Sequence, residues 1–572
     1  MKLVSSVLMS SISVKNNYII LFFFLYLCIP MPLKAQIINI KGSIKDSHSK
    51  ENLIGATLQQ QGRVNGGVTN NYGVYHMVLQ YEDSIMITVR SIGYRPLTTS
   101  LVIKKDTVID FLLDAEATTL DNVEVFAYKN NIRGRNTNIV TLPLERMKEM
   151  PALVGEVDII KSFQFMPGIQ GGKEGTSGLF VRGGSPDQNL ILLDDVPIYS
   201  VNHIGGFFSV FDPNALKSVQ LLKGSFPARY GGRLSSVLDV RLKEGNKQEH
   251  KNVLDVGLLS VRYAHEGPVK KDTSSFLFSI RRANLDIFSG IASLLATNGL
   301  FRAGYTFYDV NTKYHHIISD KDQVYLSFYG GFDRSFFRQK DSEINNDTGF
   351  KYKAKNIEQW GNLLGSFRWS HMYGKNMFSN VTLATTNYHY YNKVDIQRIS
   401  KSDNNPLDVL QMDFRSYVKD LIAKIDFEYF PNAKNVTRFG SSFTHHDFNP
   451  GSISSFQKGL DITTIDTLYG SQKQRGLEWQ AYVENEVHIT NALSVNGGVH
   501  FASYLSGEKV YINPQPRILT SYKINNGFFL NASLSKMVQY LHLLSNPGTG
   551  VPIDLWVPVT GRIKPQSSWM YS

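Results

Sequence analysis

The chain is poor in cysteine: its 572 residues include only Cys28. That residue lies inside an apolar run, Tyr18 to Ile29, which follows two lysines and precedes a small residue, Ala35. A basic start, an apolar run and a small residue are typical of a secretory signal peptide, so we expect residues 1–35 to be removed. The run is also shorter than the about 20 residues that a transmembrane helix needs. The mature chain would then have no cysteine, which excludes disulfides and thiolate metal sites.

Sequence signatures of enzymes are also missing. The chain contains no HExxH motif or comparable zinc spacing. The glycine-rich stretch 168–184 is not a phosphate-binding loop, because Pro167 stands where the first glycine would be and Lys173 is followed by Glu174. We therefore predict no catalytic residue, no cofactor and no metal site. The histidines that could suggest a metal lack a supporting carboxylate spacing; they are His315, His316, His445, His446, His500 and His542.

Positive charge is in excess but is not concentrated in one region. The chain has 60 Lys and Arg against 49 Asp and Glu, a formal charge of +11. These residues are scattered, and a secretory signal directs the protein away from nucleic acid, so we predict no nucleic-acid partner. Attraction to anionic lipid headgroups fits the charge better.

Short alternating strands dominate the first part of the mature chain. Ile38, Ile40 and Ile44 alternate with polar neighbours, and residues 85–89 and 108–111 are further strand-length apolar runs. Turns are expected at 65–67 and 71–73, where asparagine and glycine cluster. The pattern predicts a small antiparallel β-sandwich over residues 37–116.

The next region mixes strand and helix signals. Four apolar runs of strand length, bounded by Gly, Pro, Asp or Asn, predict one small buried sheet: 179–181, 190–193, 219–222 and 237–240. Asp212 followed by Pro213 is a typical helix start, with an N-cap acceptor and a first helical proline. Apolar residues at helical spacing predict an amphipathic helix over 152–163. Residues 139–247 are thus predicted to form a compact α/β domain.

Beyond residue 250 the apolar residues alternate along long segments. Residues 323–333 and 477–489 each place apolar side chains on one face and polar ones on the other. Such strands exceed the usual soluble length of about 5–6 residues and match transmembrane barrel strands. We expect about thirteen strands up to residue 540, the first two of them within 248–267 with a tip near Gly257.

The connections between these segments alternate as well. Short turns near 268–272, 318–322, 372–375, 431–435, 490–491 and 524–526 alternate with long polar segments at 283–302, 337–356, 392–412, 450–474 and 541–564. That rhythm is typical of outer-membrane barrels. A sheet in lipid must close, and plugged barrels have about 22 strands, so we expect a C-terminally truncated chain with about 13 of about 22 strands.

Short motifs in the middle region resemble the plug domain of TonB-dependent outer-membrane receptors. They are Met166-Pro167-Gly168, Val181-Arg182-Gly183-Gly184, Leu192-Leu193-Asp194-Asp195-Val196-Pro197, Lys223-Gly224 and Ala228-Arg229-Tyr230-Gly231-Gly232. The motifs Ile40-Lys41-Gly42, Leu53-Ile54-Gly55-Ala56, Thr69-Asn70-Asn71-Tyr72-Gly73 and Ser91-Ile92-Gly93-Tyr94 resemble a carboxypeptidase-regulatory-like domain, which implies no peptidase activity.

The resemblance implies a mostly β protein with four parts: a periplasmic sandwich (37–116), a coupling segment and linker (117–138), a plug (139–247) and a partial transmembrane barrel (248–572). It implies energised uptake of a scarce, bulky solute across the outer membrane. The coupling segment would pair as an added strand with a TonB-type protein through Leu120, Asp121, Val123 and Val125. The alternative is that this segment is the last strand of the sandwich or the first of the plug.

Related receptors lock the plug to the barrel by ion pairs. On this basis we expect Arg182 and Arg229 to be plug cations that pair with lumen acids such as Glu484 and Glu486; the alternative is that both arginines stabilise turns. The implied partners are a TonB-type protein, outer-membrane lipid and a small or oligomeric solute, with a surface lipoprotein left open. A passive porin or adhesin-like barrel and a soluble enzyme are the alternative functions.

Overall fold

A computed structural model describes residues 37–61, 66–70, 72–80, 82–116, 139–142, 144, 156, 158–171, 178–203, 206–340, 350–374, 376–432, 434–459, 464–470, 473–490, 492–507, 509–525, 528–544 and 555–572. The predicted signal peptide and the coupling segment, with Leu120, Asp121, Val123 and Val125, lie outside these residues. Among the described residues, no helix has both the length and the apolar character needed to cross a membrane.

The N-terminal domain, residues 37–116, consists of two small packed sheets. One contains β1 (Ile37–Asp46), β4 (Val74–Gln80), β7 (Thr107–Val108) and β8 (Phe111–Leu113), and the other contains β2 (Thr57–Gln60), β3 (Gly66–Val68), β5 (Ile85–Arg90) and β6 (Leu97–Leu101). Alternate residues of β1 and β5, such as Ile40 and Ile87, are buried between them. The sandwich is not purely antiparallel as predicted, because β1 pairs parallel with β7 and β8.

Two glycines of this domain allow a matched test of close packing. Gly73 and Gly93 both have a left-handed backbone (φ 74° and 78°), but a Cβ on Gly73 would lie 2.4 Å from Asn52 Cβ, whereas nothing lies within 4 Å of one on Gly93. In both variants alanine must adopt a left-handed backbone conformation, which costs about 1–2 kcal/mol. We expect Gly73→Ala to cost about 1–3 kcal/mol more, because its Cβ would overpack the domain. Amide hydrogen exchange of β1 and β4 in the intact protein measures this difference. Equal exchange in the two variants would contradict it.

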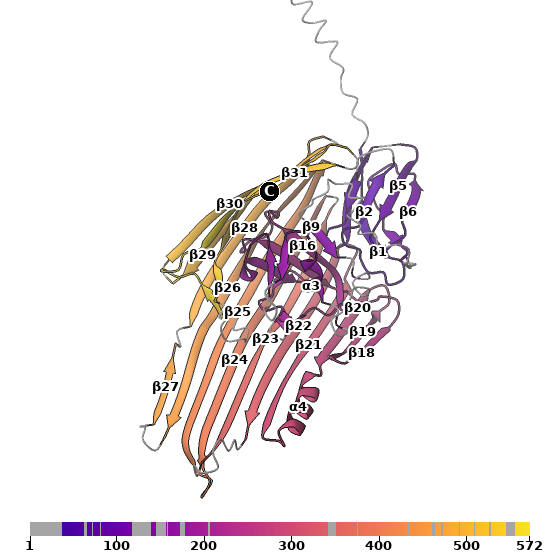
Figure 1. The fold of residues 1–572 in the computed structure, drawn as a ribbon. Helices are drawn as coiled ribbons and strands as arrows, with labels where there is room; N and C mark the ends of the chain where they lie inside the picture. Colours follow the sequence, from indigo (N-terminus) through magenta and orange to yellow (C-terminus); the bar gives the residue numbers. More distant parts are fainter. Residues whose placement is uncertain are drawn as a thin grey trace, which may run out of the picture.

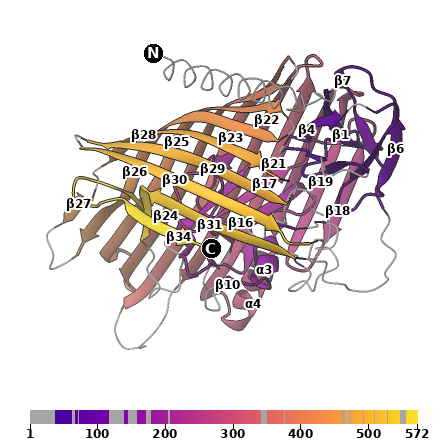
Figure 2. The same ribbon diagram turned by 90° about the horizontal axis from the view of Figure 1, so that it is seen from above.

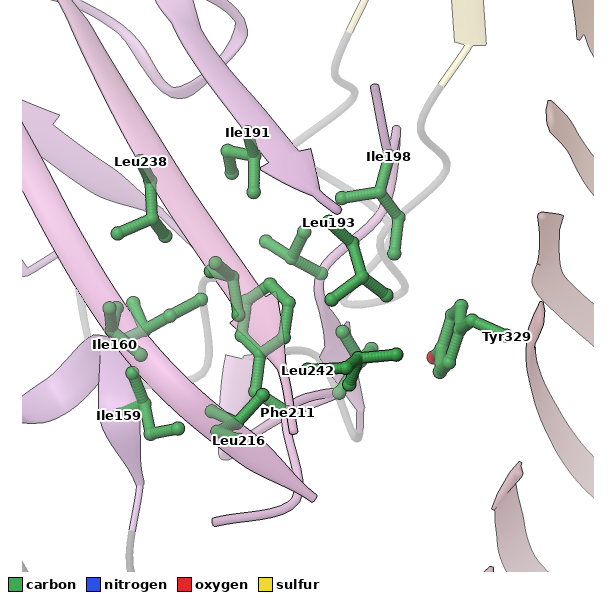
Figure 3. Packing of buried hydrophobic residues seen from close by; sticks show 14 of the residues in the cluster. Ile159, Ile160, Ile191, Leu193, Ile198, Phe211, Leu216, Leu238, Leu242 and Tyr329 are labelled. Carbon is green, nitrogen blue, oxygen red and sulfur yellow. The ribbon is translucent and has the colours of Figure 1, made fainter. Parts of the chain in front are cut away.

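The plug, residues 139–247, has a five-stranded sheet at its centre. Its order is β13 (Val196–Pro197), β12 (Asn189–Leu193), β17 (Ser236–Leu242), β16 (Leu216–Lys223) and β9 (Ile139–Leu142), with β12 and β17 parallel and the other pairs antiparallel. The helix α3 (Ile159–Gln164) packs on it and is capped by Asp158, which accepts a hydrogen bond from Lys161 N at 2.9 Å. Figure 3 shows the apolar core between them, with Tyr329 of the surrounding sheet facing it.

Two predictions for this region are wrong. The segment after Asp212 is a turn rather than a helix: Asp212 accepts from Asn214 N (3.1 Å), and β16 begins at Leu216. An acidic residue followed by proline also starts turns, and pairing of β16 with β17 decides against a helix. The run 179–181 does not join the central sheet, because β11 (Leu179–Val181) pairs with β10 (Ile169–Gly171) in a separate ribbon.

Among the described residues from 251 onward, 15 strands form one antiparallel sheet that curves around the plug (Figures 1 and 2). Its strands are β18 (Lys251–Val256), β19 (Ser260–Lys270), β20 (Ser274–Ala283), β21 (Phe301–Ile317), β22 (Asp322–Gln339), β23 (Phe350–Tyr373), β24 (Met377–Ser400), β25 (Pro406–Asn432), β26 (Asn435–Lys458), β27 (Ile465–Tyr469), β28 (Gln474–His488), β29 (Leu493–Ser506), β30 (Lys509–Lys523), β31 (Phe529–Gln539) and β34 (Gln566–Tyr571). We call this sheet the wall. Each of the thirteen predicted strands corresponds to one observed strand.

Alternation along the wall strands separates two environments. On β22, Tyr325 and Tyr329 face the plug and are 3% and 1% exposed, whereas Leu326 and Phe328 face outward and are 49% and 41% exposed. Aromatic and aliphatic side chains on the outer face suit contact with lipid, as the sequence predicts.

Described residues in the segments predicted as long loops include regular secondary structure. Strands extend into them, so that β24 ends at Ser400 and β25 already begins at Pro406. The segment 283–302, predicted as a polar loop, contains the helix α4 (Leu285–Ala296), and 541–564 contains the hairpin of β32 (Leu541–Leu544) and β33 (Leu555–Pro558). The N-terminal domain lies at the end of the wall with the short turns, where His76 stacks on Phe430 at 4.8 Å. We call this end the inner end and the opposite one the outer end.

Candidate functional site

The interface between plug and wall contains most of the buried charge, and a two-residue hairpin of the plug organises part of it. Asp194 and Asp195 connect β12 to β13 with φ of 49° and 72°, the backbone of a type I′ turn, which aspartate tolerates. Asp194 is thereby placed against the wall, where it accepts hydrogen bonds from Lys313 Nζ (3.0 Å) and Ser327 Oγ (2.7 Å). Burial raises the pKa of Asp194, but Lys313 and other nearby cations outweigh it and hold the pKa below its usual value.

Asp195 connects all three parts of the protein. Within the plug it forms a bidentate ion pair with Arg241, and on the wall Arg368 lies 3.4 Å away. From the N-terminal domain, Tyr72 donates its hydroxyl to Asp195 Oδ2 at 3.1 Å, and Arg368 stacks on the Tyr72 ring at 4.6 Å. Burial raises the pKa of Asp195, but Arg241 and the other cations outweigh it and hold it well below its usual range. The carboxylate therefore stays charged.

His203 forms a second contact, on β14 (Asn202–His203), between two wall aspartates. Its Nε2 lies 3.0 Å from Asp309 Oδ2 and its Nδ1 lies 2.9 Å from Asp333 Oδ2, while its ring stacks on Phe307 with 3.8 Å between centroids. Arg281 of β20 donates to the same Asp309 at 2.6 Å. Burial alone lowers the pKa of His203, but the two carboxylates outweigh it and raise the pKa to about 9. The histidine is therefore cationic at neutral pH.

A third ion pair reinforces this side of the plug. Glu156 lies 2.7 Å from Arg262 of β19 and 3.9 Å from Arg281 of β20. Together with the contacts of Asp194, Asp195 and His203, it means that strands β19 to β23 hold the plug through ionised side chains of opposite sign. Hydrogen bonds between charged groups are roughly twice as strong as neutral ones, so this side is firmly fastened.

On the opposite side of the plug, the loop of residues 226–233 makes several contacts with the wall. Arg517 of β30 donates to three backbone carbonyls of this loop: Phe226 (3.2 Å), Pro227 (2.8 Å) and Tyr230 (2.6 Å). His500 Nδ1 lies 2.8 Å from the carbonyl of Ala228. These acceptors are neutral, in contrast to the carboxylates on the other side.

The structure brings together one of the predicted ion pairs. Arg229 Nη1 lies 3.6 Å from Glu484 Oε1, and the Arg229 backbone N–H donates to Glu484 Oε2 at 3.1 Å. Glu486 accepts from Arg438 Nη1 at 3.3 Å, and Arg182 donates to Ser572 Oγ at 3.2 Å, so these two residues have partners other than the predicted ones. The role of the four residues in holding the plug stays a prediction.

Sequence reasoning missed Asp194, His203 and Glu156 as contact residues. The pair Asp194-Asp195 after a buried strand was visible in the sequence and indicated a turn, but its wall partners are more than a hundred positions away. No local signal marked His203. Within the described residues, no group of three or more His, Cys, Asp or Glu side chains is arranged to hold a metal ion.

Between the loop 226–233 and the wall lies a cavity of about 120 Å³. Its lining residues come from the plug, from β25, β26 and β28 of the wall, and from His500 and Leu541; they include Asp195, Tyr199, Arg229, Arg233, Asp420, Lys424, His446 and Glu478. Charged and hydroxyl groups thus face an internal space at the plug surface, where they can contact a polar molecule.

The arrangement of a small α/β domain inside a curved antiparallel sheet agrees with matches to known families. Residues 129–236 match the TonB-dependent Receptor Plug Domain, and residues 40–125 match the CarboxypepD_reg-like domain. The chain carries the plug of a TonB-dependent receptor. This assignment places the protein in the outer membrane, with the plug inside the β-sheet of a barrel.

Curated relatives of this receptor chain are all named as receptors or transporters. It is 23% identical over 513 residues to the probable TonB-dependent siderophore receptor PirA of Acinetobacter baumannii, covering 79% of this chain and 65% of the relative. It is 26% identical over 193 residues to the vitamin B12 transporter BtuB of Vibrio vulnificus (31% and 30%) and 25% identical over 173 residues to the ferrienterobactin receptor of Escherichia coli (27% and 22%). The chain thus spans less than two thirds of each relative.

Solved receptor structures share the fold of this chain. A mutant of the ferric enterobactin receptor of Pseudomonas aeruginosa matches with a TM-score of 0.50 at 15% identity, covering 76% of this chain and 68% of that one. The outer membrane transporter YddB of Escherichia coli matches with a TM-score of 0.50 at 12% identity, covering 70% and 61%. At this identity the likeness concerns the fold.

Proposed function

We propose that the full-length protein takes up a scarce, bulky solute across the outer membrane by TonB-coupled transport. The observation that carries this proposal is the position of the plug, which lies inside the curve of the wall and is fastened to it by buried ion pairs of Asp194, His203 and Glu156. A solute can pass only if the plug moves, and breaking several buried ion pairs requires an energy input. A passive porin has no need of such a plug.

The proposed coupling segment has a suitable position in the chain. Leu120, Asp121, Val123 and Val125 lie between β8 of the N-terminal domain and β9 of the plug, so a pull on them acts on both parts. Strand addition would give a TonB-type partner affinity through backbone hydrogen bonds. A surface lipoprotein and outer-membrane lipid are further proposed partners. The names of the relatives make ferric siderophores and vitamin B12 the first solutes to test, followed by glycans and peptides.

Deletion of residues 120–127 tests the coupling. We expect uptake of the solute identified by growth assays to fall at least about tenfold. The deletion removes the strand that would form backbone hydrogen bonds with the TonB-type partner, and with it several kcal/mol of binding free energy. Deletion of residues 129–136, an equal length of the adjacent linker, is the control and should retain most of the uptake. Heat-modifiable gel migration of outer-membrane fractions verifies that both variants fold. Full uptake in the first variant would contradict energised transport.

A further inference from the structure

The cavity beside the plug extends along three neighbouring wall strands. Its lining includes alternate residues that face the plug, which from the inner to the outer end are Lys424, Ile422 and Asp420 on β25, Ser442 and Thr444 and His446 on β26, and Tyr482, Gln480 and Glu478 on β28. Positions four residues apart on a strand are separated by about 13 Å. The cavity therefore follows the strand direction, the direction in which a solute would have to pass the plug.

The wall strands contribute mainly polar side chains to the lining of this cavity, whereas the plug also contributes Leu190, Leu192 and Pro197. Acids, cations and hydroxyl groups alternate around it, and its volume of about 120 Å³ could hold a few water-sized molecules. At the outer part, Arg233 of the plug is only 8% exposed; it donates from Nη1 to the Gly232 carbonyl and lies 5.3 Å from the Trp556 ring. Its Nε has no hydrogen-bond partner among the described residues. A buried donor of a residue that lines a cavity suits a ligand that brings oxygen acceptors.

The N-terminal domain lies close to the inner end of the cavity. Asp195 lines that end, and the Tyr72 hydroxyl covers it from the N-terminal domain at 3.1 Å. Asn70 of the same domain donates to Glu428 of β25 at 3.0 Å. The cavity thus leads toward the domain that precedes the proposed coupling segment.

The fastening of the plug differs between its two sides. On the side of β19 to β23, ionised plug residues meet wall residues of opposite charge, as in the pairs Asp194 with Lys313 and His203 with Asp309. On the side of β25 to β30, Arg229 and Glu484 form one ion pair, and Tyr199 of the plug donates its hydroxyl to Asp420. The other contacts of the loop 226–233 run from Arg517 and His500 to its backbone carbonyls. The first side has several ion pairs between plug and wall and the second has one, so we expect the second side to open at a lower free energy.

We propose that the plug opens on the side of β25, β26 and β28 while it stays attached to β19 to β23, and that this cavity widens into the path of a hydrophilic, oxygen-rich solute. The proposal rests on the proposed function for its solute, but the side on which the plug opens is a property of the fold alone. It assigns Arg233 as the plug residue that the solute contacts first inside the gap.

Single cysteines measure which side opens, because residues 37–572 contain none. Ser442→Cys reports on the cavity, and Ser327→Cys reports on the fastened side, where the native hydroxyl donates to Asp194 at 2.7 Å. The full-length receptor in lipid vesicles is treated with a maleimide attached to a polymer much larger than the resting cavity, in urea below the unfolding transition. We expect urea to increase the labelling rate at 442 at least about tenfold more than at 327.

Ser327→Cys removes a hydrogen bond and so loosens the fastened side, but Ser442 is the more exposed position at rest. Labelling is therefore measured at each position with and without urea, and the increase that urea causes is compared between the two positions. Thr444→Cys is a second reporter on the cavity, in case one variant does not fold. An equal increase on the two sides, or a larger increase at 327, would overturn the proposal. The assay uses neither solute nor energy coupling, so a failure of TonB-dependent uptake leaves its outcome unaffected.

Discussion

Replacement of His203 by alanine is expected to destabilise the closed receptor by about 3–5 kcal/mol, the usual cost of removing one partner from a buried ion pair. The variant leaves the carboxylates of Asp309 and Asp333 facing each other in a buried site without the cation between them. It also removes the ring that stacks on Phe307. Denaturant unfolding of the purified receptor measures the loss of stability.

A second measurement and a control variant test this prediction further. Cells with the variant should become sensitive to a bulky antibiotic that an intact plug excludes. His48→Ala, at an exposed position of the N-terminal domain, is the control and should change neither property. Unchanged stability and an unchanged antibiotic barrier in the His203 variant would show that this contact does not hold the plug.

The same histidine predicts a pH dependence. A group whose pKa is higher in the folded state contributes stability that is fully present below its unfolded pKa, about 6.5 for histidine, and is lost as the pH rises through the folded pKa. For His203 the folded pKa is about 9. The plug should therefore be fastened equally well at pH 5.5 and 6.5 and loosen toward pH 9–10, an effect that the alanine variant should lack.

Replacement of Arg241 by methionine is the second change with a large expected effect. Arg241 is buried in the plug and is shared by Asp195 and Asp239, with 2.7 Å between its Nε and Asp239 Oδ1. Methionine leaves both carboxylates without this cation, which should cost about 3–5 kcal/mol and displace the hairpin that contacts Lys313. Accumulation of the receptor in outer-membrane fractions and its denaturant unfolding measure this effect.

A double variant separates the ion pair from simple packing. Arg241→Met combined with Asp195→Asn removes both charges of the pair and should recover part of the lost stability, because neutralising both partners costs less than leaving one unpaired. Arg241→Lys keeps the charge without the planar fork and should have an intermediate effect. If the double variant is less stable than Arg241→Met alone, the electrostatic explanation is wrong.

The sequence predicted the wall strands well because their signal is local. Along β22, for example, Tyr325 faces the plug, whereas Leu326 and Phe328 face outward. This alternation of side chains between two different environments repeats over many residues. Predictions failed where a short signal fits two structures. Asp212-Pro213 starts a turn as readily as a helix, and apolar residues of 285–296 occur in a segment that was predicted as a loop although it forms α4.

The candidate site was predicted less completely than the fold. The motif around Asp194 and Asp195 was identified as the end of a strand, and Arg229 lies beside Glu484 as anticipated. Lys313, Arg368 and the aspartates around His203 could not be assigned to the plug from the sequence. Their partners are brought together by the curvature of the wall and the position of the plug inside it, which no local pattern encodes.

The sequence by itself determined that this protein has a mostly β chain with a long alternating second half, since side-chain polarity at every second position specifies a sheet with one apolar face. Only the tertiary structure decided which charged residues meet across the plug interface and which side of the plug has a cavity. Charges in contact there are separated by one to several hundred residues, so their pairing depends on how the strands curve and not on their order in the chain.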